Sequence, residues 1–295
     1  GAPLMYTYVT KYELDASGVS NGKTIYEYDV VQDFPYVLSG SSNFVHLILN
    51  DWKNGFLSKE SHYSRSGSTY NLARKIENQY VLFKKDTTYN LSVKTPQIVL
   101  GCTVKHASTI DSDAQYLSVP MPTGVKKLVR TIETEYDGSG NSIQTTVNTQ
   151  YGASSHDLPT KVSKQNSSGI IINNTLKYPI DFASPGNVYE KMVNANIISP
   201  LIESKYLKEV SGTETLLSTV KNNYRDWKND GLVLMPETVQ GSLYSNSLIN
   251  KIVFTDYNDK RKPAEVKKDM DKTMSYLYDY NDQYPVAEIS NANQA

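Results

Sequence analysis

The chain has 295 residues, a mass of 33.1 kDa and a formal net charge of −1 at neutral pH. A chain of this length can bury a core without metals or disulfides. Its near-zero charge argues against a nucleic-acid partner, which needs a clustered basic surplus. Its single cysteine excludes an internal disulfide, and its apolar runs are too short to span a bilayer. The 23 Tyr, against 6 Phe and 2 Trp, favour rings with one packed face and a wet hydroxyl, as on a half-exposed β-surface.

Alternation of apolar and polar residues, which is typical of half-buried strands, is the dominant local pattern. The alternating runs come in pairs, and turns rich in Gly, Asn, Asp and Ser separate the members of each pair. The sequence therefore predicts an all-β fold, a series of antiparallel hairpins that form curved sheets. The six predicted hairpins have strands at 6–14 and 24–30, 59–63 and 70–80, 128–136 and 141–151, 159–164 and 170–178, 201–210 and 214–224, and 249–257 and 263–268.

One short helix, over residues 187–196, interrupts the predicted hairpins. Ser184 is the expected N-cap, and Pro185 suits the first helical position. Val188 and Met192 form an apolar stripe at helical spacing, so we expect the helix to pack on a face of a sheet.

A boundary and an internal repeat organise the rest of the chain. The Pro- and Gly-rich stretch 120–124 predicts a division between an N-terminal β module, residues 1–122, and a hairpin-repeat region, residues 123–295. The segment Asp-Trp-Lys-Asn at 51–54 recurs at 226–229 and contains both tryptophans. We interpret the chain as a degenerate repeat of hairpins about 20–35 residues long, a period typical of arrays and solenoids.

Several turn motifs carry a family resemblance. The turn Tyr136-Asp137-Gly138-Ser139-Gly140-Asn141 matches the YDxxGN core of YD repeats, and 257–263 is a weaker version. The stretch 276–289 looks like the Y-x-(W/Y)-x-YN…YPVAEI segment of large secreted RHS-like proteins of Gram-negative bacteria. The chain therefore resembles YD-repeat, RHS-like proteins over roughly 125–289, and more faintly over 43–80.

The resemblance implies an extracellular or cell-surface β-strip whose partners are neighbouring repeats of a larger parent chain. In RHS proteins such hairpins spiral into a shell that can enclose a toxic C-terminal segment. Only one YDxxGN is intact here, and no self-cleaving protease signature follows, which favours a short β-sheet platform beside such an array. The first residues lack the basic and apolar regions of a signal peptide, so we expect a mature fragment or a segment of a longer protein.

Two turns could be read as metal-binding loops. The oxygen-bearing residues of Asp137–Asn141 resemble the start of a calcium loop, but the distal bidentate Glu is missing, so turn chemistry is the favoured interpretation. Asp111-Ser112-Asp113 is interpreted as an exposed acidic turn for the same reason.

The histidines and the cysteine offer little chemistry. His46, His62, His106 and His156 form neither HExxH nor an i, i+4 pair, and strand positions explain His46 and His62 without a metal. Cys102 is expected to be a small buried strand residue. A thiol nucleophile paired with His106 or His156 is the alternative, but no activating motif surrounds it.

The functional expectation is a non-enzymatic structural scaffold with no cofactor. The alternative is a module that binds a glycan or a surface protein through Trp52 and Trp227, which could stack on sugar rings or form an interface. The matched sequence around the two tryptophans favours a packing role, in which each anchors its own hairpin. A glycan hydrolase is a further alternative, because its two carboxylates need not be close in sequence.

Overall fold

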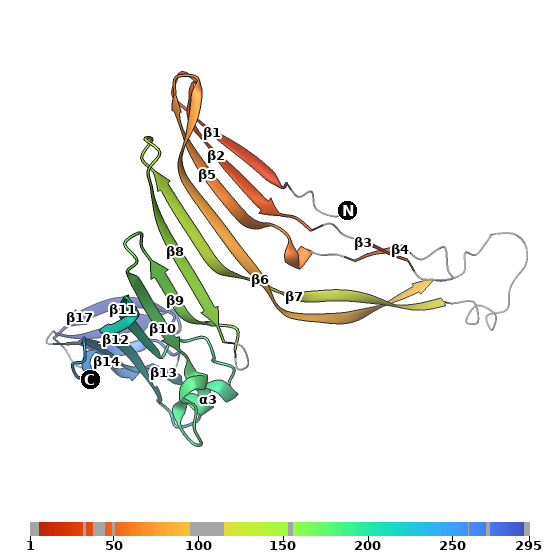
Figure 1. The fold of residues 1–295 in the computed structure, drawn as a ribbon. Coiled ribbons are helices and arrows are strands. Elements are labelled where there is room, and N and C mark those ends of the chain that lie inside the picture. The colour runs from red at the N-terminus through yellow and green to blue at the C-terminus, as the bar shows by residue number, and fades with distance from the viewer. Residues whose placement is uncertain are drawn as a thin grey trace, which may run out of the picture. The chain divides into compact units, whose positions relative to one another are not determined.

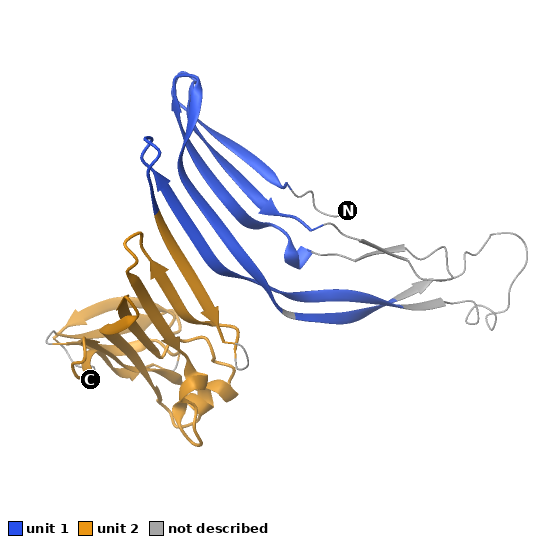
Figure 2. Ribbon diagram, in the orientation of Figure 1, with its two compact units in different colours: residues 1–143 blue, residues 144–295 orange. Residues whose placement is uncertain are grey.

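The computed structural model describes residues 6–31, 34–37, 45–48, 51–94, 115–152, 156–258, 260–269 and 272–291. These residues form antiparallel β-strands almost throughout, which confirms the predicted all-β fold of hairpins (Figure 1). The chain divides into two compact units, residues 1–143 and 144–295 (Figure 2). The sequence placed a boundary at 122, whereas the structure has residues 120–124 inside a single long strand.

The first unit contains a sheet in which strands that follow one another along the chain pair side by side. Its order is β1 (Tyr8–Leu14), β2 (Ser20–Asp29), β5 (Phe56–Ser66), β6 (Thr69–Lys94) and β7 (Gln115–Tyr136). The short strands β3 (Phe34–Val37) and β4 (Val45–Ile48) pair with each other, and a 3-10 turn, η1 (Asp51–Lys53), precedes β5. Beyond their pairing with the rest of the sheet, β6 and β7 continue as a two-stranded ribbon (Figure 1).

The second unit is an antiparallel meander that runs from β8 to β17 in sequence order. Its strands are β8 (Ser142–Tyr151), β9 (Pro159–Gln165), β10 (Ile171–Lys177), β11 (Glu203–Val210), β12 (Thr213–Asp226), β13 (Leu234–Leu243), β14 (Ile249–Tyr257), β15 (Pro263–Lys268), β16 (Thr273–Asp279) and β17 (Tyr284–Ser290). All six predicted hairpins correspond to consecutive strands of the structure, whereas β13, β16 and β17 were not assigned as strands from the sequence.

The predicted helix is present as α3 (Val188–Asn194), but the predicted N-cap is wrong. Asn187 caps the helix instead, because its Oδ1 accepts the Glu190 N–H at 2.8 Å. Ser184 lies one turn earlier and holds Asn187 in place, through an Asn187 Nδ2 to Ser184 Oγ bond of 2.9 Å. A short helix that the sequence did not predict, α2 (Pro179–Phe182), comes before it.

A cluster of buried apolar side chains lies in the second unit. Met192 of α3 and Ile202 are both fully buried, and Leu234 of β13 completes the cluster. The side chains packed around it are Phe182, Val188, Tyr189, Ile197 and Tyr224. The helix therefore serves as the cover of one sheet face, as its apolar stripe predicted.

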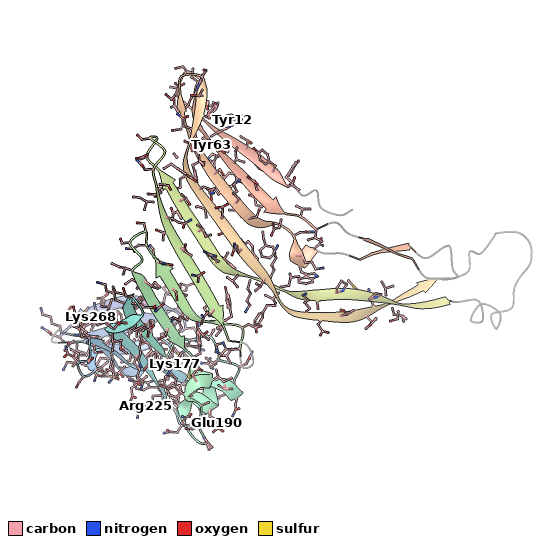
Figure 3. The ribbon with its side chains drawn as sticks, viewed as in Figure 1. Tyr12, Tyr63, Lys177, Glu190, Arg225 and Lys268 are labelled. Atoms are coloured by element: carbon pink, nitrogen blue, oxygen red, sulfur yellow. The ribbon has the colours of Figure 1, made fainter. Side chains whose placement is uncertain are left out.

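The first unit is stabilised differently, by long side chains that pair across strands. Small polar residues in mid-strand, such as Thr24 and Ser61, are buried at 3% and 2% exposure. The Lys23 ammonium lies 5.2 Å from the ring of Tyr63, which Figure 3 labels, and 4.7 Å from that of Tyr70. Cross-strand pairs of this kind contribute fractions of a kcal/mol each, so the stability of this sheet is spread over many small terms.

Candidate functional site

Four hairpin turns of the chain share one hydrogen-bond pattern. In each, an Asp or Asn side chain accepts the backbone N–H groups two and four residues further on. The first residue of each turn is Asp15, Asp137, Asn166 or Asn258, and its oxygen-to-nitrogen distances lie between 2.8 and 3.1 Å. The fourth residue of each turn has positive φ: Gly18 at 77°, Gly140 at 95°, Gly169 at 77° and Arg261 at 61°.

The turn at Asp137 uses its carboxylate internally. Asn141 Nδ2 donates to Oδ2 at 2.7 Å, while Oδ1 accepts the Ser139 and Asn141 N–H groups. These bonds, that from the Asn141 amide first, lower the pKa of Asp137. Among the described residues, no three His, Cys, Asp or Glu side chains gather as metal ligands. The structure thus supports turn chemistry at 137–141, while Asp111 and Asp113 lie outside the described residues.

Two histidine side chains are described, that of His62 in a strand and that of His156 in a loop. His62 Nδ1 lies 3.2 Å from Thr24 Oγ1, and its Nε2 lies 2.9 Å from Glu60. His156 is buried, accepts the Leu158 N–H at 3.1 Å and packs its ring on Tyr178. The side chain of His46 in β4, and the whole of Cys102 and His106, lie outside the described residues.

The two tryptophans lie in different units and in different local structures, despite their matched sequence. Asp51–Lys53 forms η1, whereas Asp226 is the last residue of β12. Trp227 is fully engaged: its Nε1 donates to the Met235 carbonyl at 3.3 Å, and its ring lies 5.1 Å from that of Tyr257. The Arg225 guanidinium lies 4.9 Å from the same ring. Trp227 therefore packs as an anchor between β13 and β14.

Beside Trp227, an ion pair with a buried carboxylate and a partly exposed lysine ties α3 to the turn between β12 and β13. Asp226 is 8% exposed, and its Oδ2 accepts Lys191 Nζ at 2.8 Å and the Gly231 N–H at 2.9 Å. The hydrogen bond from Lys191, and after it that from Gly231, lowers the pKa of Asp226. A lowered pKa means that the carboxylate stabilises the fold above its unfolded pKa of about 3.9, and that this stability is lost as the pH falls.

We expect Asp226→Asn to lower the free energy of unfolding of the second unit by about 1–2 kcal/mol at pH 7, because it removes the charge that pairs with Lys191. The loss is limited because solvent screens the partly exposed Lys191. The difference between variant and wild type should shrink as the pH falls from about 5 through the lowered folded pKa. Urea unfolding at several pH values measures it. If the stability difference between variant and wild type stayed constant from pH 7 to pH 2.5, the proposed role of the ion pair would be contradicted.

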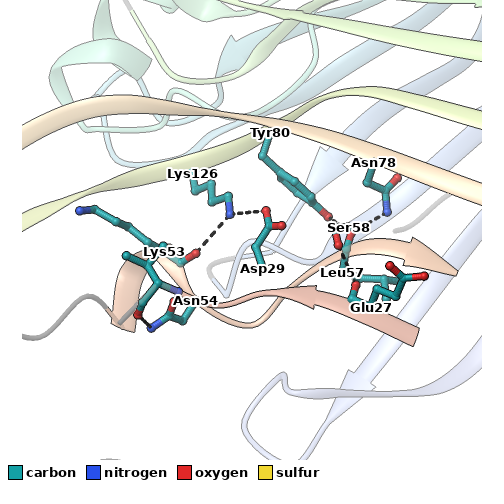
Figure 4. Close-up of polar contacts among 10 residues, drawn as sticks. Glu27, Asp29, Lys53, Asn54, Leu57, Ser58, Asn78, Tyr80 and Lys126 are labelled. Atoms are coloured by element: carbon teal, nitrogen blue, oxygen red, sulfur yellow. Dashed lines mark hydrogen bonds and ion pairs between the residues drawn. The ribbon is translucent and has the colours of Figure 1, made fainter. Parts of the chain in front are cut away.

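Trp52 belongs to a turn that is held by a polar framework (Figure 4). Lys126 of β7 donates to Asp29 Oδ2 at 2.7 Å and to the Lys53 carbonyl at 3.2 Å. Its ammonium also lies 4.8 Å from the ring of Phe56 and 5.3 Å from that of Tyr80. With its side chain only 10% exposed, Lys126 ties the end of η1 to β2 and β7.

Asn54 fixes the other side of the same turn. Its Oδ1 accepts the Val31 N–H at 2.5 Å, and its Nδ2 donates to the Val31 carbonyl at 3.1 Å. The Gly55 N–H donates to the Asp29 carbonyl at 3.2 Å, and Gly55 has φ of 77°. Because Gly55 is bonded to the last residue of β2 and Asn54 to Val31 just after it, the end of the turn that follows Trp52 is held against this part of the chain.

A cleft of about 260 Å³ lies beside Trp52. It is lined by Trp52, Lys53, Leu82, Lys85, Asp86, Thr87, Pro122 and Thr123. The Trp52 Nε1–H is buried and has no hydrogen-bond acceptor among the described residues. The sequence singled out Trp52 but not the other lining residues, which β6 and β7 bring together. No local sequence pattern singled out those residues, because the register of β6 on β7 brings them together.

Two carboxylates face each other elsewhere in the chain, on the hairpin of β11 and β12. Glu209 and Glu214 are directly opposite in the register, and Asn173 Nδ2 donates to both, at 2.9 and 2.8 Å. Asn173 is 1% exposed, and its Oδ1 accepts Ser163 Oγ at 2.7 Å. The amide and Lys161, 3.6 Å from Glu214, offset the repulsion of the pair, which therefore belongs to the cross-strand network of the sheet.

The tyrosine hydroxyls have a recurring role that composition alone did not predict. Tyr80, Tyr178 and Tyr278 each donate to a backbone carbonyl at the start of the preceding strand of their hairpin. The acceptors are the carbonyls of Leu57, Pro159 and Pro263, at 2.9, 2.8 and 2.9 Å. Each tyrosine thus closes the open end of a hairpin, opposite its turn. Other tyrosines, such as Tyr8 and Tyr284, are exposed, in line with the expected wet surface.

Removing such a hydroxyl should cost one partly buried hydrogen bond. We expect Tyr80→Phe to lower the stability of the first unit by about 0.5–1.5 kcal/mol, since the Leu57 carbonyl then keeps only the Asn78 amide as a side-chain donor. Tyr89→Phe is the matched control, because Tyr89 lies in the same strand and is 70% exposed. Urea unfolding compares the two variants, and equal losses would contradict the closing role of Tyr80.

Comparison of the chain with protein-family models and with curated proteins finds no match. Within the part of the chain that the structure describes, no helix has the length and apolar character needed to cross a membrane.

Proposed function

We propose that the chain is a structural segment of a larger secreted or cell-surface protein, a non-enzymatic scaffold built from hairpins related to YD repeats. The observation that carries the proposal is the turn that recurs at Asp15, Asp137, Asn166 and Asn258 with the same bonds and a positive φ at its fourth residue. A single binding or catalytic site would not require the same turn at several places in the chain. Repetition of the same turn along a chain is what an array of equivalent hairpins requires.

The tyrosines support the same proposal from the opposite end of the hairpins. The sequence separations between Tyr80 and Leu57, Tyr178 and Pro159, and Tyr278 and Pro263 differ, yet each pair makes the same bond. The β9–β10 hairpin has both features, the polar turn at Asn166 and the Tyr178 bond at its open end, and the tyrosine bond tolerates changes in strand length. That tolerance explains how the repeat can persist in both units while its sequence spacing is irregular.

The first strand offers the edge along which an array would continue. The Tyr28 N–H donates to the Thr7 carbonyl. Because the backbone groups of every second residue of an antiparallel strand point to the same neighbour, those of Val9 and Lys11 also point toward β2. The backbone groups of Tyr8, Thr10 and Tyr12 then face outward. Every residue of β1 except Thr10 is exposed. An unpaired strand of this length is a template for another strand, so we propose that a neighbouring repeat of the parent protein pairs with it.

Hydrogen exchange tests this proposal. The amides of β1 in the 295-residue chain alone are compared with those in the protein recovered from the source that produces it. We expect at least about 10-fold slower exchange across β1 in the recovered protein, because a neighbouring strand protects outward N–H groups. The central strand β9, already paired on both sides, is the internal control. Equal exchange of β1 in both samples would overturn the scaffold proposal.

A further inference from the structure

The outer part of the β6–β7 ribbon has one edge that is blocked against a further strand. Beyond Glu77, where its pairing with β5 ends, β6 pairs with β7 alone among the described strands. Tyr89 stands opposite Pro120, and Thr87 stands opposite Pro122. Because proline has no N–H to donate, the two strands exchange no hydrogen bonds at these positions. The backbones of the two prolines therefore face outward, and their missing N–H groups block the β7 edge.

The β6 edge of the same ribbon has no such protection. By the same alternation, the backbone groups of Thr87, Tyr89 and Leu91 point away from β7. The Thr87 N–H supports this orientation, because it donates to Asp86 Oδ1 at 2.7 Å and not to β7. Proline and charged residues are the usual protection of an edge strand, and residues 87–93 include neither. The β6 edge is therefore open to pairing.

The strand that carries this open edge is also poorly covered. Every residue from 85 to 91 is exposed, and the side chains of Tyr89 and Leu91 are 70% and 63% exposed. Two paired strands alone are marginally stable in water, and a third strand with apolar side chains adds the stability that they lack. A strand at the β6 edge would satisfy the outward N–H and C=O groups and pack against these two side chains.

The sequence of this edge is complementary to itself. When β6 of a second copy lies antiparallel to it, centred on Asn90, Tyr89 of one copy stands opposite Leu91 of the other. Both residues have outward backbone groups, as a hydrogen-bonded pair requires. An aromatic residue opposite an aliphatic one is a favourable cross-strand pair. The same register sets Asp86 opposite position 94, which is a lysine. By symmetry this pair of opposite charges occurs at both ends of the paired segment.

We propose that two copies of the chain pair through the β6 edge, antiparallel about Asn90, and form a dimer with two-fold symmetry. The charges select this register, because the neighbouring registers that also match outward groups set position 94 opposite Lys84 or Thr88 and lose the pair with Asp86. Each copy offers the same edge to the other, so the contact is closed and assembly stops at two chains. This proposal does not rest on the scaffold proposal, which concerns β1, and either can fail without the other.

Light scattering during gel filtration of the full chain tests the dimer. We expect a mass near twice 33.1 kDa at high concentration, which falls to the single-chain mass on dilution. Leu91→Pro removes an outward N–H that the ribbon itself does not use, and should leave single chains only. The matched control Ser118→Pro removes an outward N–H from the β7 edge, directly opposite Leu91, and should dimerise as the wild type does. Far-UV circular dichroism should be the same for both variants.

Three outcomes of this measurement would overturn the proposal. The first is a single-chain mass for the wild type at every concentration. The second is an assembly of more than two chains, because the two-fold contact is closed. The third is a dimer that survives Leu91→Pro, which would mean that another edge, such as β1, joins the two copies.

A charge exchange tests the register. Asp86→Lys replaces two attractive pairs of the dimer by two repulsive ones, and should weaken dimerisation by about 10-fold. Combining Asp86→Lys with Lys94→Asp restores opposite charges at the same two positions, and should return the dimer dissociation constant to within about 3-fold of the wild-type value. If the double variant dimerised no better than Asp86→Lys alone, the two positions would not be opposite each other, and pairing about Asn90 would be wrong.

Discussion

Replacing Tyr257 with alanine is expected to destabilise the second unit by about 3–5 kcal/mol, the cost of removing a buried aromatic ring. Tyr257 is 3% exposed, at the end of β14. Its ring centroid lies 5.1 Å from that of Trp227 and 5.7 Å from that of Phe254. The variant therefore removes the shared partner of both rings, and burial also raises the pKa of the Tyr257 hydroxyl far above its usual value.

Urea unfolding followed by fluorescence in a Trp52→Phe background, which leaves Trp227 as the one tryptophan, measures this loss. Tyr206→Ala is the matched control, because Tyr206 lies in β11 and is 41% exposed. Its effect should stay within about 0.5 kcal/mol. If Tyr257→Ala destabilised the unit no more than Tyr206→Ala, the Trp227–Tyr257 contact would not be an anchor between strands, and the packing role assigned to Trp227 would be wrong.

Replacing Met192 with alanine should cost the same unit about 2–5 kcal/mol, through lost burial and the cavity that remains. Met192 is fully buried and joins α3 to Ile202 and to Leu234 of β13. Because α3 is only seven residues long, it is too short to persist without this contact. The helical signal at 188–194 should therefore be lost along with the stability.

The control for Met192 is Val210→Ala, at an exposed position of β11. It removes two methyl groups from a surface strand and should change stability by about 0.5 kcal/mol at most. Hydrogen exchange of residues 188–194 reports the helix separately from the sheet. A Met192→Ala chain with normal protection of α3 would contradict the view that this side chain holds the helix on the sheet.

Local patterns predicted the hairpins well because each pattern had its own short-range cause. The alternation at 128–136 and the Gly-rich turn at 137–141 act within a few residues, and the structure has β7 and β8 there. The helix at 188–194 followed from the spacing of Val188 and Met192 in the same way. Its cap was misplaced because Ser184 and Asn187 are both good N-caps, and residue preference alone does not choose between them; in the structure Asn187 caps the helix and also bonds to the Phe182 carbonyl.

Features that depend on pairing between strands could not be predicted. The bulge at 83–86 arises from the register of β6 on β7, and no local signal sets that register. The Asp-Trp-Lys-Asn echo indicated two equivalent turns, yet Asn54 bonds to Val31 while Asn229 adopts a positive φ of 56°. Identical residues therefore took different roles because their neighbouring strands differ.

The central claim is that the recurring turns are interchangeable parts of one repeating hairpin, and exchanging two of them tests it. Residues 15–18 (Asp-Ala-Ser-Gly) and 166–169 (Asn-Ser-Ser-Gly), in both of which only the fourth residue has positive φ, would be swapped, and the free energy of unfolding measured in urea. The account predicts a change within about 0.5 kcal/mol. The control exchanges Ser168 and Gly169, which puts Ser at φ of 77° and should cost about 1–2 kcal/mol. A swap as costly as that control would contradict the equivalence of the turns, and with it the scaffold of repeated hairpins.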